Sequence, residues 1–133
     1  MGQDVVTSFS MMVAEEMDFP LNRLLIEYAD ANSALGQQMT VGSSSVSLWW
    51  NRMREVGAYI RASAVALAAS QFSVPAEECS TKNGVVYHVG SQRQVEYLDL
   101  IQDVSSLLYD GPITLKANSE FDLIGCEVAS ELV

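Results

Sequence analysis

The chain has 133 residues, of which 49% are hydrophobic and 18% are charged, and its formal net charge is −10. This length and apolar content predict one soluble globular domain and exclude a disordered tail. A membrane span and a nucleic-acid partner are not expected, because no apolar run approaches the ~20 residues of a bilayer span and no cluster of Lys or Arg could follow a phosphate backbone.

The first predicted element is a helix. Apolar residues between Val5 and Met17 recur at the 3.6-residue helical period, and Asp4 stands where an N-cap is expected. Residues 24–29 are apolar and partly β-branched, which predicts a short buried strand. Residues 31–39 are expected to form a loop before the next helix.

The longest predicted helix follows the serine run at positions 43–45. Gly57 inside this helix costs about 1 kcal/mol relative to alanine, so we expect another element to approach it closely. Trp49 and Trp50 are adjacent and cannot share one face, so one should lie in the core and the other on a surface that another part covers. The apolar stripe expected to face the core consists of Val46, Trp49, Trp50, Met53, Val56, Ile60, Ala64 and Leu67.

The strongest turn signal is the dipeptide Asn83-Gly84, which predicts a hairpin between residues 79–82 and 85–89. His88 alternates with valines in the second strand of this hairpin. We therefore expect it to be a partly exposed strand residue rather than a catalytic one.

The remaining elements complete an α+β pattern. A turn at Gly90 leads into an extended segment at residues 92–95, and the apolar spacing over residues 97–108 predicts a third helix. Residues 113–116 and 121–124 look extended. The order of helices and strands predicts a two-layer sandwich in which helices pack on a small mixed sheet with a hairpin.

The sequence contains few residues that could bind a metal, and its acidic and basic residues do not indicate a functional site. Cys79, Cys126 and one histidine are too few for a four-ligand zinc site, so no metal site is expected. The two cysteines should be half-buried thiols, and a single disulfide between them stays open. Acidic and basic residues of the two long helices, including Glu15, Glu16, Arg54 and Arg61, are expected to be solvated or to form surface ion pairs.

Two loops carry the clearest functional signal. Residues 1–4 and 40–46 are each glycine-containing, rich in hydroxyl or amide groups, and lead directly into a helix. A helix N-terminus presents unpaired backbone N–H groups and the positive end of the helix dipole, which favours a phosphate or pyrophosphate. The pair predicts an anion or nucleotide site, although a serine run on its own also serves as a simple N-cap.

Taken in order and spacing, these motifs resemble the large subunit of molybdenum hydroxylases. The resemblance is to the branch of isoquinoline 1-oxidoreductase beta subunits and related aldehyde dehydrogenases, within the xanthine dehydrogenase and aldehyde oxidase family. It covers nearly the whole chain. The residues that carry it are Met1, Gly2, Gln3 and Thr7; Ala14, Glu15, Glu16 and Met17; residues 40–46; Arg54, Gly57, Ala58 and Arg61; residues 74–79 and 83–86; and residues 115–116 and 123–125.

The resemblance implies a molybdopterin cofactor, often the cytosine dinucleotide, and hydroxylation of an aldehyde or an N-heterocycle with water as the oxygen source. Electrons would leave through iron–sulfur clusters on a partner small subunit. The two loops are implied to contact the pterin and pyrophosphate, and the residues that match are Gly2, Gln3, Gly42, Ser43 and Ser45, with Thr40 and Val46 as further candidates.

The chain departs from the family pattern at two loop positions, where Asp4 and Val41 each replace a glycine. A carboxylate next to a pyrophosphate would repel it unless Asp4 caps the first helix. Val41 would restrict the backbone to negative φ.

No segment resembles the one that carries the family's catalytic glutamate. Residues 1–133 are therefore expected to be one domain of a longer bacterial-type subunit, inactive alone, with residues 111–133 leading into the next domain. The compartment, cytoplasmic or periplasmic, stays open. The alternative is a free-standing acidic α+β module that binds a protein partner through the second helix.

Overall fold

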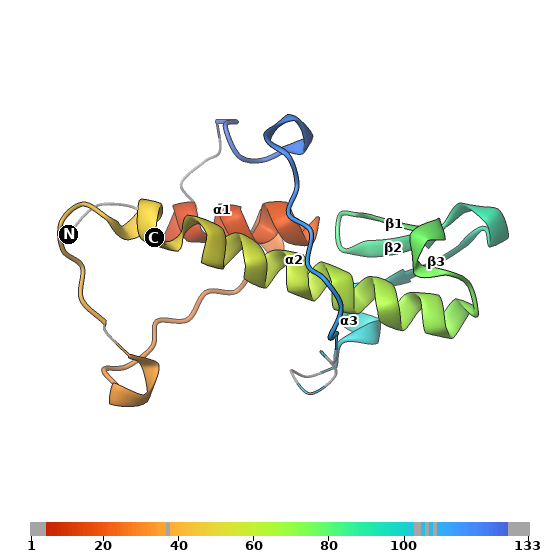
Figure 1. Cartoon of the computed structure of the whole chain (residues 1–133), viewed down its shortest axis with the longest axis horizontal. Helices are drawn as coiled ribbons and strands as arrows, with labels where there is room; N and C mark the ends of the chain where they lie inside the picture. Colours follow the sequence, from red (N-terminus) through yellow and green to blue (C-terminus); the bar gives the residue numbers. More distant parts are fainter. Residues whose placement is uncertain (1–4, 37, 103–104, 106, 108, 128–133) are drawn as a thin grey trace.

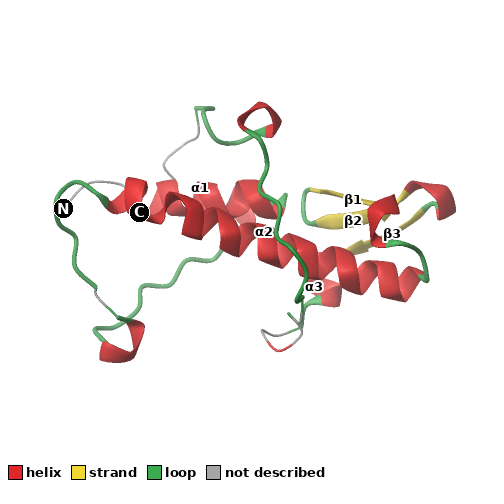
Figure 2. Ribbon diagram, in the orientation of Figure 1, coloured by secondary structure: helices red, strands yellow, loops and turns green. Residues whose placement is uncertain are grey.

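Two long helices lie side by side and carry a small sheet at one end, as a computed structural model of the chain shows (Figures 1 and 2). The structure describes residues 5–36, 38–102, 105, 107 and 109–127. The helices are α1 (Val5–Met17), α2 (Ser45–Phe72) and the short α3 (Tyr97–Leu100). Single 3₁₀ turns lie at Leu21–Arg23, Ser33–Leu35, Ala76–Glu78, Val89–Ser91 and Asn118–Glu120.

Helices α1 and α2 run parallel. The backbone of α2 at Gly57 lies against Val13 of α1, and further along both helices Met17 shares a cluster with Ala64. The connecting residues 18–44 return along the pair to the beginning of α2 (Figure 1). The N-termini of both helices therefore lie at the same end of the molecule, away from the sheet.

The sheet has three strands in the order β1 (Cys79–Lys82), β2 (Val85–His88) and β3 (Arg93–Glu96), and both pairings are antiparallel. The α+β class and the hairpin are confirmed, while the described strands form an antiparallel rather than a mixed sheet. Asn83 and Gly84 have φ values of 52° and 77°. Two successive positive φ angles are typical of the type I′ turn that Asn-Gly favours.

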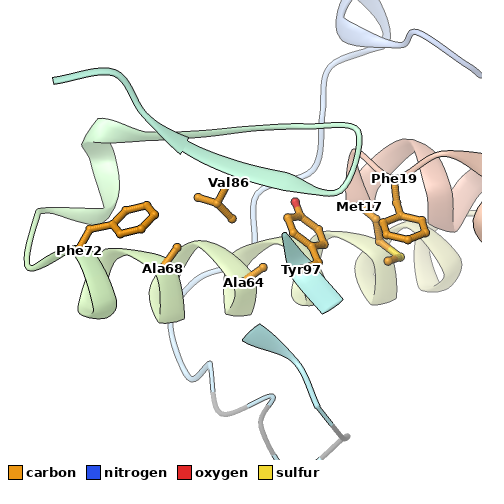
Figure 3. Close-up of a cluster of buried hydrophobic side chains, with 7 residues drawn as sticks. All are labelled: Met17, Phe19, Ala64, Ala68, Phe72, Val86 and Tyr97. Carbon is orange, nitrogen blue, oxygen red and sulfur yellow. The ribbon is translucent and has the colours of Figure 1, made fainter. Parts of the chain in front are cut away.

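The core fills the layer between α2 and the hairpin (Figure 3). Small side chains on α2 let the sheet approach, and the tip of the hairpin is fixed by Gly84, whose N–H donates to Asp18 O at 2.6 Å. A Cβ at Gly84 would lie 2.7 Å from the ring of Phe19. The buried cluster consists of Met17, Phe19, Ala64, Ala68, Phe72, Val86 and Tyr97.

The prediction of a buried strand at residues 24–29 is wrong, because the structure of this chain has no strand there. The segment pairs with no described strand, and Leu25 and Tyr28 are 86% and 79% exposed. The apolar, β-branched pattern is present, but a strand also requires a neighbour whose backbone can pair with it. Residues 31–39 form the expected loop around the 3₁₀ turn at Ser33–Leu35, with residue 37 outside the described part.

The prediction that the apolar stripe of α2 faces the core is wrong in its first half. Val46, Trp49 and Val56 are 40%, 41% and 49% exposed. The buried face of that half instead contains Arg54 and Gly57, because α1 presents carboxylates there and a charged partner satisfies them.

The close approach expected at Gly57 is confirmed, since a Cβ there would lie 2.4 Å from Val13 O. Trp50 is half-buried with its ring edge-on to Phe121, whereas Trp49 is exposed, so the two adjacent tryptophans lie on different faces as expected. The expectation that one of them belongs to the core is wrong, because the buried cluster contains neither.

The third helix is shorter than predicted. It ends at Leu100, because Ile101 adopts an extended backbone; positions 103–104, 106 and 108 of the predicted helix lie outside the described residues. Residues 121–124 bend rather than extend, since their N–H groups turn toward one carboxylate of α1. Both cysteines are free thiols, with Cys79 half-buried and Cys126 exposed.

Candidate functional site

The loop before α2 is a tight turn with open access to its backbone. Gly42 and Ser43 both have positive φ, at 64° and 53°. The turn is closed by the N–H and the hydroxyl of Ser44, which donate to Val41 O at 3.4 and 2.9 Å. A Cβ added to Gly42 would meet only Ser44 Oγ at 3.9 Å, so an incoming group can approach this backbone closely.

The first turn of α2 keeps its N–H groups available. The N-cap Ser44 makes no side-chain cap bond, since its hydroxyl faces back to Val41. Neither α1 nor α2 has an acidic residue in its first turn. Uncapped N–H donors and the helix dipole make this an end that favours an anion.

The residues of this loop that the sequence predicted to bind a ligand all lie in the turn or at the beginning of α2. Thr40, Gly42, Ser43 and Val46 are exposed, and Ser45, the first residue of α2, is half-buried. Val41 is not among the residues with positive φ, so a valine fits here without backbone strain. The donor set is therefore compatible with a phosphate or amide-bearing ligand.

Gly2, Gln3 and Asp4 of the other predicted loop lie outside the described residues. Helix α1, into which they lead, begins at Val5 at the same end as α2 (Figure 1). Because the helices are parallel, their dipoles add at this end rather than cancel.

Sequence reasoning missed a charge cluster that joins α1, α2 and the C-terminal segment. We use this name for Glu15, Glu16, Asp18, Arg54, Arg61 and Lys116, which together carry three negative and three positive charges. Glu16 is fully buried, and its carboxylate accepts from Arg54 Nε at 2.8 Å and lies 3.6 Å from Arg61 Nη2.

Arg54 and Arg61 also fasten the C-terminal segment. They donate to the carbonyls of Lys116 at 2.6 Å and Thr114 at 2.9 Å, while Lys116 N–H donates to the second Glu16 oxygen at 3.1 Å. The expected ion pairing of Arg54 and Arg61 with nearby acids is confirmed, but its expected place on the surface is wrong. The Arg54–Glu16 pair is buried and Arg61 is half-buried, because the segment at residues 114–116 lies over them. Both arginines are committed to this cluster and are not free for a phosphate.

The other glutamate, Glu15, is 3% exposed rather than solvated. One of its oxygens, Oε2, accepts from Leu123 N–H at 2.7 Å and Ile124 N–H at 3.0 Å, and Lys116 Nζ lies 2.9 Å from Oε1. Burial alone would raise the pKa of Glu15, but these donors outweigh burial and lower that pKa below its ordinary 4.5. In the same way, Asp18 and Glu15 outweigh burial and raise the pKa of Lys116 above 10.5.

The lowered pKa of Glu15 makes folding stability depend on pH. The ionised carboxylate is favoured in the folded chain, so its contribution is present above pH 4.5 and is lost as the pH falls through the folded pKa. We expect the free energy of unfolding of the wild type to exceed that of Glu15→Gln near neutral pH, with the difference becoming smaller as the pH falls below 4.5 and through the lower folded pKa. Denaturant titrations of both proteins across this range measure it; a constant difference would contradict the assignment.

His88 is buried, at 6% exposure, so the expectation of partial exposure is wrong. Its Nδ1 accepts from Ser91 N–H at 3.1 Å, which assigns the proton to Nε2, 2.9 Å from Glu78 Oε2. The ring caps the turn at Val89–Ser91 and links it to Glu78. This role is structural.

Among the described residues, no group of three or more His, Cys, Asp or Glu side chains is placed to hold a metal ion. In the same part of the chain, no helix has the length and apolar character needed to cross a membrane.

Comparison with known proteins gives one family. The model of a family described as molybdopterin cofactor-binding domain matches residues 1–131. The beta subunit of isoquinoline 1-oxidoreductase from Brevundimonas diminuta is 33% identical over 111 residues, covering 78% of this chain and 14% of that protein. The membrane-bound aldehyde dehydrogenase [pyrroloquinoline-quinone] of Gluconacetobacter polyoxogenes is 28% identical over 101 residues, or 76% of this chain and 13% of that protein.

A third relative is the B subunit of nicotinate dehydrogenase from Pseudomonas putida strain KT2440, 25% identical over 128 residues, which are 94% of this chain and 10% of that protein. The chain thus spans 10–14% of the length of these relatives.

Proposed function

Because the chain belongs to the molybdopterin cofactor-binding domain family, we propose that it supplies one part of the cofactor site of a molybdenum oxidoreductase large subunit. The cofactor we propose is the cytosine dinucleotide form. Its pyrophosphate and pterin would lie at the shared N-terminal end of α1 and α2.

The observation that supports this proposal is the parallel packing of α1 and α2. It brings two helix N-termini, each following a loop of the family pattern, to one end of the molecule. In an antiparallel pair the two loops would be separated by about the length of α1. Parallel packing of consecutive helices needs a long connection, which residues 18–44 provide.

The residues proposed to hold the cofactor are Gly2, Gln3, Gly42, Ser43 and Ser45, with Thr40 and Val46 beside them. The glycines admit close backbone approach, the serines offer hydroxyl donors, and Gln3 offers both an amide donor and an acceptor.

When bound, the cofactor would supply the redox chemistry of substrate hydroxylation. This chain's contribution is to bind and orient it. We propose an aldehyde or an N-heterocycle as the substrate of the full subunit and an iron–sulfur small subunit as its electron-accepting partner, with the 133-residue chain inactive alone.

We expect Gly42→Val in the full subunit to lower the bound molybdenum and pterin by about tenfold or more. A branched side chain at an exposed backbone position would block the ligand, and a loss of about 1.4 kcal/mol in binding already gives a factor of ten. Molybdenum content by elemental analysis and pterin content by fluorescence of the oxidised extract measure the effect.

Gly36→Val is the matched control. Gly36 has a similar positive φ, 75°, and nothing within 4 Å of an added Cβ, but it lies outside the proposed site. With φ 75° and ψ −149°, Gly36 occupies a region that is essentially restricted to glycine, so Gly36→Val also imposes backbone strain, yet its cofactor content should stay at the wild-type level. Full cofactor content in Gly42→Val would refute the proposed site.

A second candidate is a free-standing module that binds a protein partner through α2. The observation that favours it is the exposure of Leu48, Trp49 and Val56 on that helix, at 69%, 41% and 49%. The reading frame around this chain separates the two: continuation into the remaining segments of a large subunit supports the first, and a frame closed at both ends supports the second.

A further inference from the structure

Residues 24–29 have the apolar, partly β-branched sequence of a β-strand, and residues 24–27 also have its alternating burial. Leu24 and Ile26 are half-buried, whereas Leu25 and Glu27 are exposed. Alternation with a period of two is the signature of a strand that lays one face on a core. Leu24 itself packs against the buried cluster.

The backbone of this segment has no strand partner. Within the described part of the chain, no backbone N–H of residues 25–29 donates to another residue, although the segment is flanked by ordered bonds at Leu24 N–H and Asp30 O. An exposed row of unpaired N–H and C=O groups with large apolar side chains, here Leu25 at 86% and Tyr28 at 79% exposure, is a template for strand addition.

The chain's own sheet does not extend to this segment. Arg23 forms an ion pair with Glu96 of β3 at 3.2 Å, but the connection that follows runs away from the sheet and swings out from the helices before it reaches the beginning of α2 (Figure 1). The complementary strand must therefore come from residues outside the part that the structure describes.

We propose that residues 24–29 form a β-strand by adding to an open sheet edge supplied by the rest of the large subunit. This inference rests on the proposed function, in which the chain is one domain of a longer polypeptide. The occupant is argued from length: the relatives are so long that this chain covers only 10–14% of them. The added strand would run beside the helix pair and help fix the domain against its neighbour.

Hydrogen exchange tests the inference directly. The full subunit, as its complete reading frame encodes it, and the 133-residue chain are compared by mass spectrometry on peptides that cover residues 24–29. We expect roughly 100-fold slower exchange in the subunit than in the isolated chain. Equal, fast exchange in both would overturn the proposal.

Proline substitutions in the subunit provide a second readout. Successive N–H groups of a strand point to opposite edges, so at least one of Ile26→Pro and Glu27→Pro should remove a ladder bond and abolish the protection. Ser33→Pro is the matched control, because Ser33 is the first residue of a 3₁₀ turn, where proline is tolerated. Retained protection in both strand variants would count against pairing.

Cofactor content measured on the same samples separates this inference from the proposed function. A subunit that holds molybdenum and pterin while residues 24–29 exchange freely would overturn the strand and leave the function. A subunit in which residues 24–29 are protected but no cofactor is bound would support the strand and contradict the proposed function. Protection that appears in the isolated chain and grows with its concentration would assign the partner to a second copy and overturn the proposal.

Discussion

Replacing Glu16 with alanine is expected to lower the free energy of unfolding by about 3–5 kcal/mol, the cost of breaking a buried ion pair from one side. Glu16 is 0% exposed and Arg54 is 6% exposed, so the guanidinium would lose its counter-charge without gaining water. Lys116 N–H would lose its acceptor as well. Since whole domains are stable by only about 5–15 kcal/mol, this single change should remove much of the stability. Denaturant unfolding followed by far-UV circular dichroism measures it.

Glu55→Ala controls for the loss of one acidic side chain, because Glu55 is exposed on α2, and it should change the unfolding free energy by no more than about 0.5 kcal/mol. A double-mutant cycle measures the interaction energy between Glu16 and Arg54. Arg54→Ala should lower the unfolding free energy by at least about 1 kcal/mol less in the Glu16→Ala background than in the wild type. If Glu16→Ala and Glu55→Ala had equal effects, the buried pair would contribute nothing.

The elements predicted correctly are those whose signals are local. Helix α1 follows from apolar periodicity, and the hairpin follows from Asn83-Gly84, whose preference for positive φ selects one turn type. Neither depends on what the rest of the chain does. The parallel direction of α1 and α2, by contrast, is set by tertiary contacts that periodicity does not encode.

The elements predicted wrongly needed a partner that the local pattern does not reveal. Residues 24–29 have strand character without a described neighbour, and the helix predicted at residues 97–108 stops after Leu100. For α2, apolar spacing suggested one buried face, yet carboxylates on α1 select another. A helix buries the face that its neighbour complements, and that choice is not local.

One feature of the sequence could have indicated the charge cluster: an acidic residue on the apolar face of the first helix. Glu16 falls on the same helical face as Val13 and Met17, and an acid on an apolar face needs a buried partner. Two basic residues on α2, Arg54 and Arg61, supply it. Their joint placement could be suspected from spacing, but the covering segment at residues 114–116 could not.

For the candidate cofactor site, the sequence predicted both loops, and the structure describes only the second. What the structure adds is that both helices begin at one end, which follows from their parallel packing. The charge cluster and Gly57 hold that packing in place. Changes in the charge cluster or at Gly57 should therefore also affect the shared end of α1 and α2 where we propose the cofactor binds.

The contact at Gly57 gives the second large expected effect. A Cβ there would lie 2.4 Å from Val13 O and 2.9 Å from Glu16 Cβ. Because the first of these atoms belongs to helix backbone, α1 itself must move. We expect Gly57→Ala to lower the unfolding free energy by about 1–3 kcal/mol through overpacking, despite a gain of about 1 kcal/mol in helix propensity. Gly57→Val should lower it further, and denaturant unfolding measures both.

Asn51→Ala is the matched control, since Asn51 is exposed on the same helix and the change also favours helix formation, so it should be neutral or slightly stabilising. The sign of the change in unfolding free energy for Gly57→Ala tests whether α1 and α2 are in contact at Gly57. A stabilisation like that of Asn51→Ala would mean that they are not in contact there. Because the proposed cofactor site lies at the shared N-terminal end of α1 and α2, a displacement of α1 by Gly57→Ala in the full subunit should also reduce bound molybdenum and pterin, while Asn51→Ala should not.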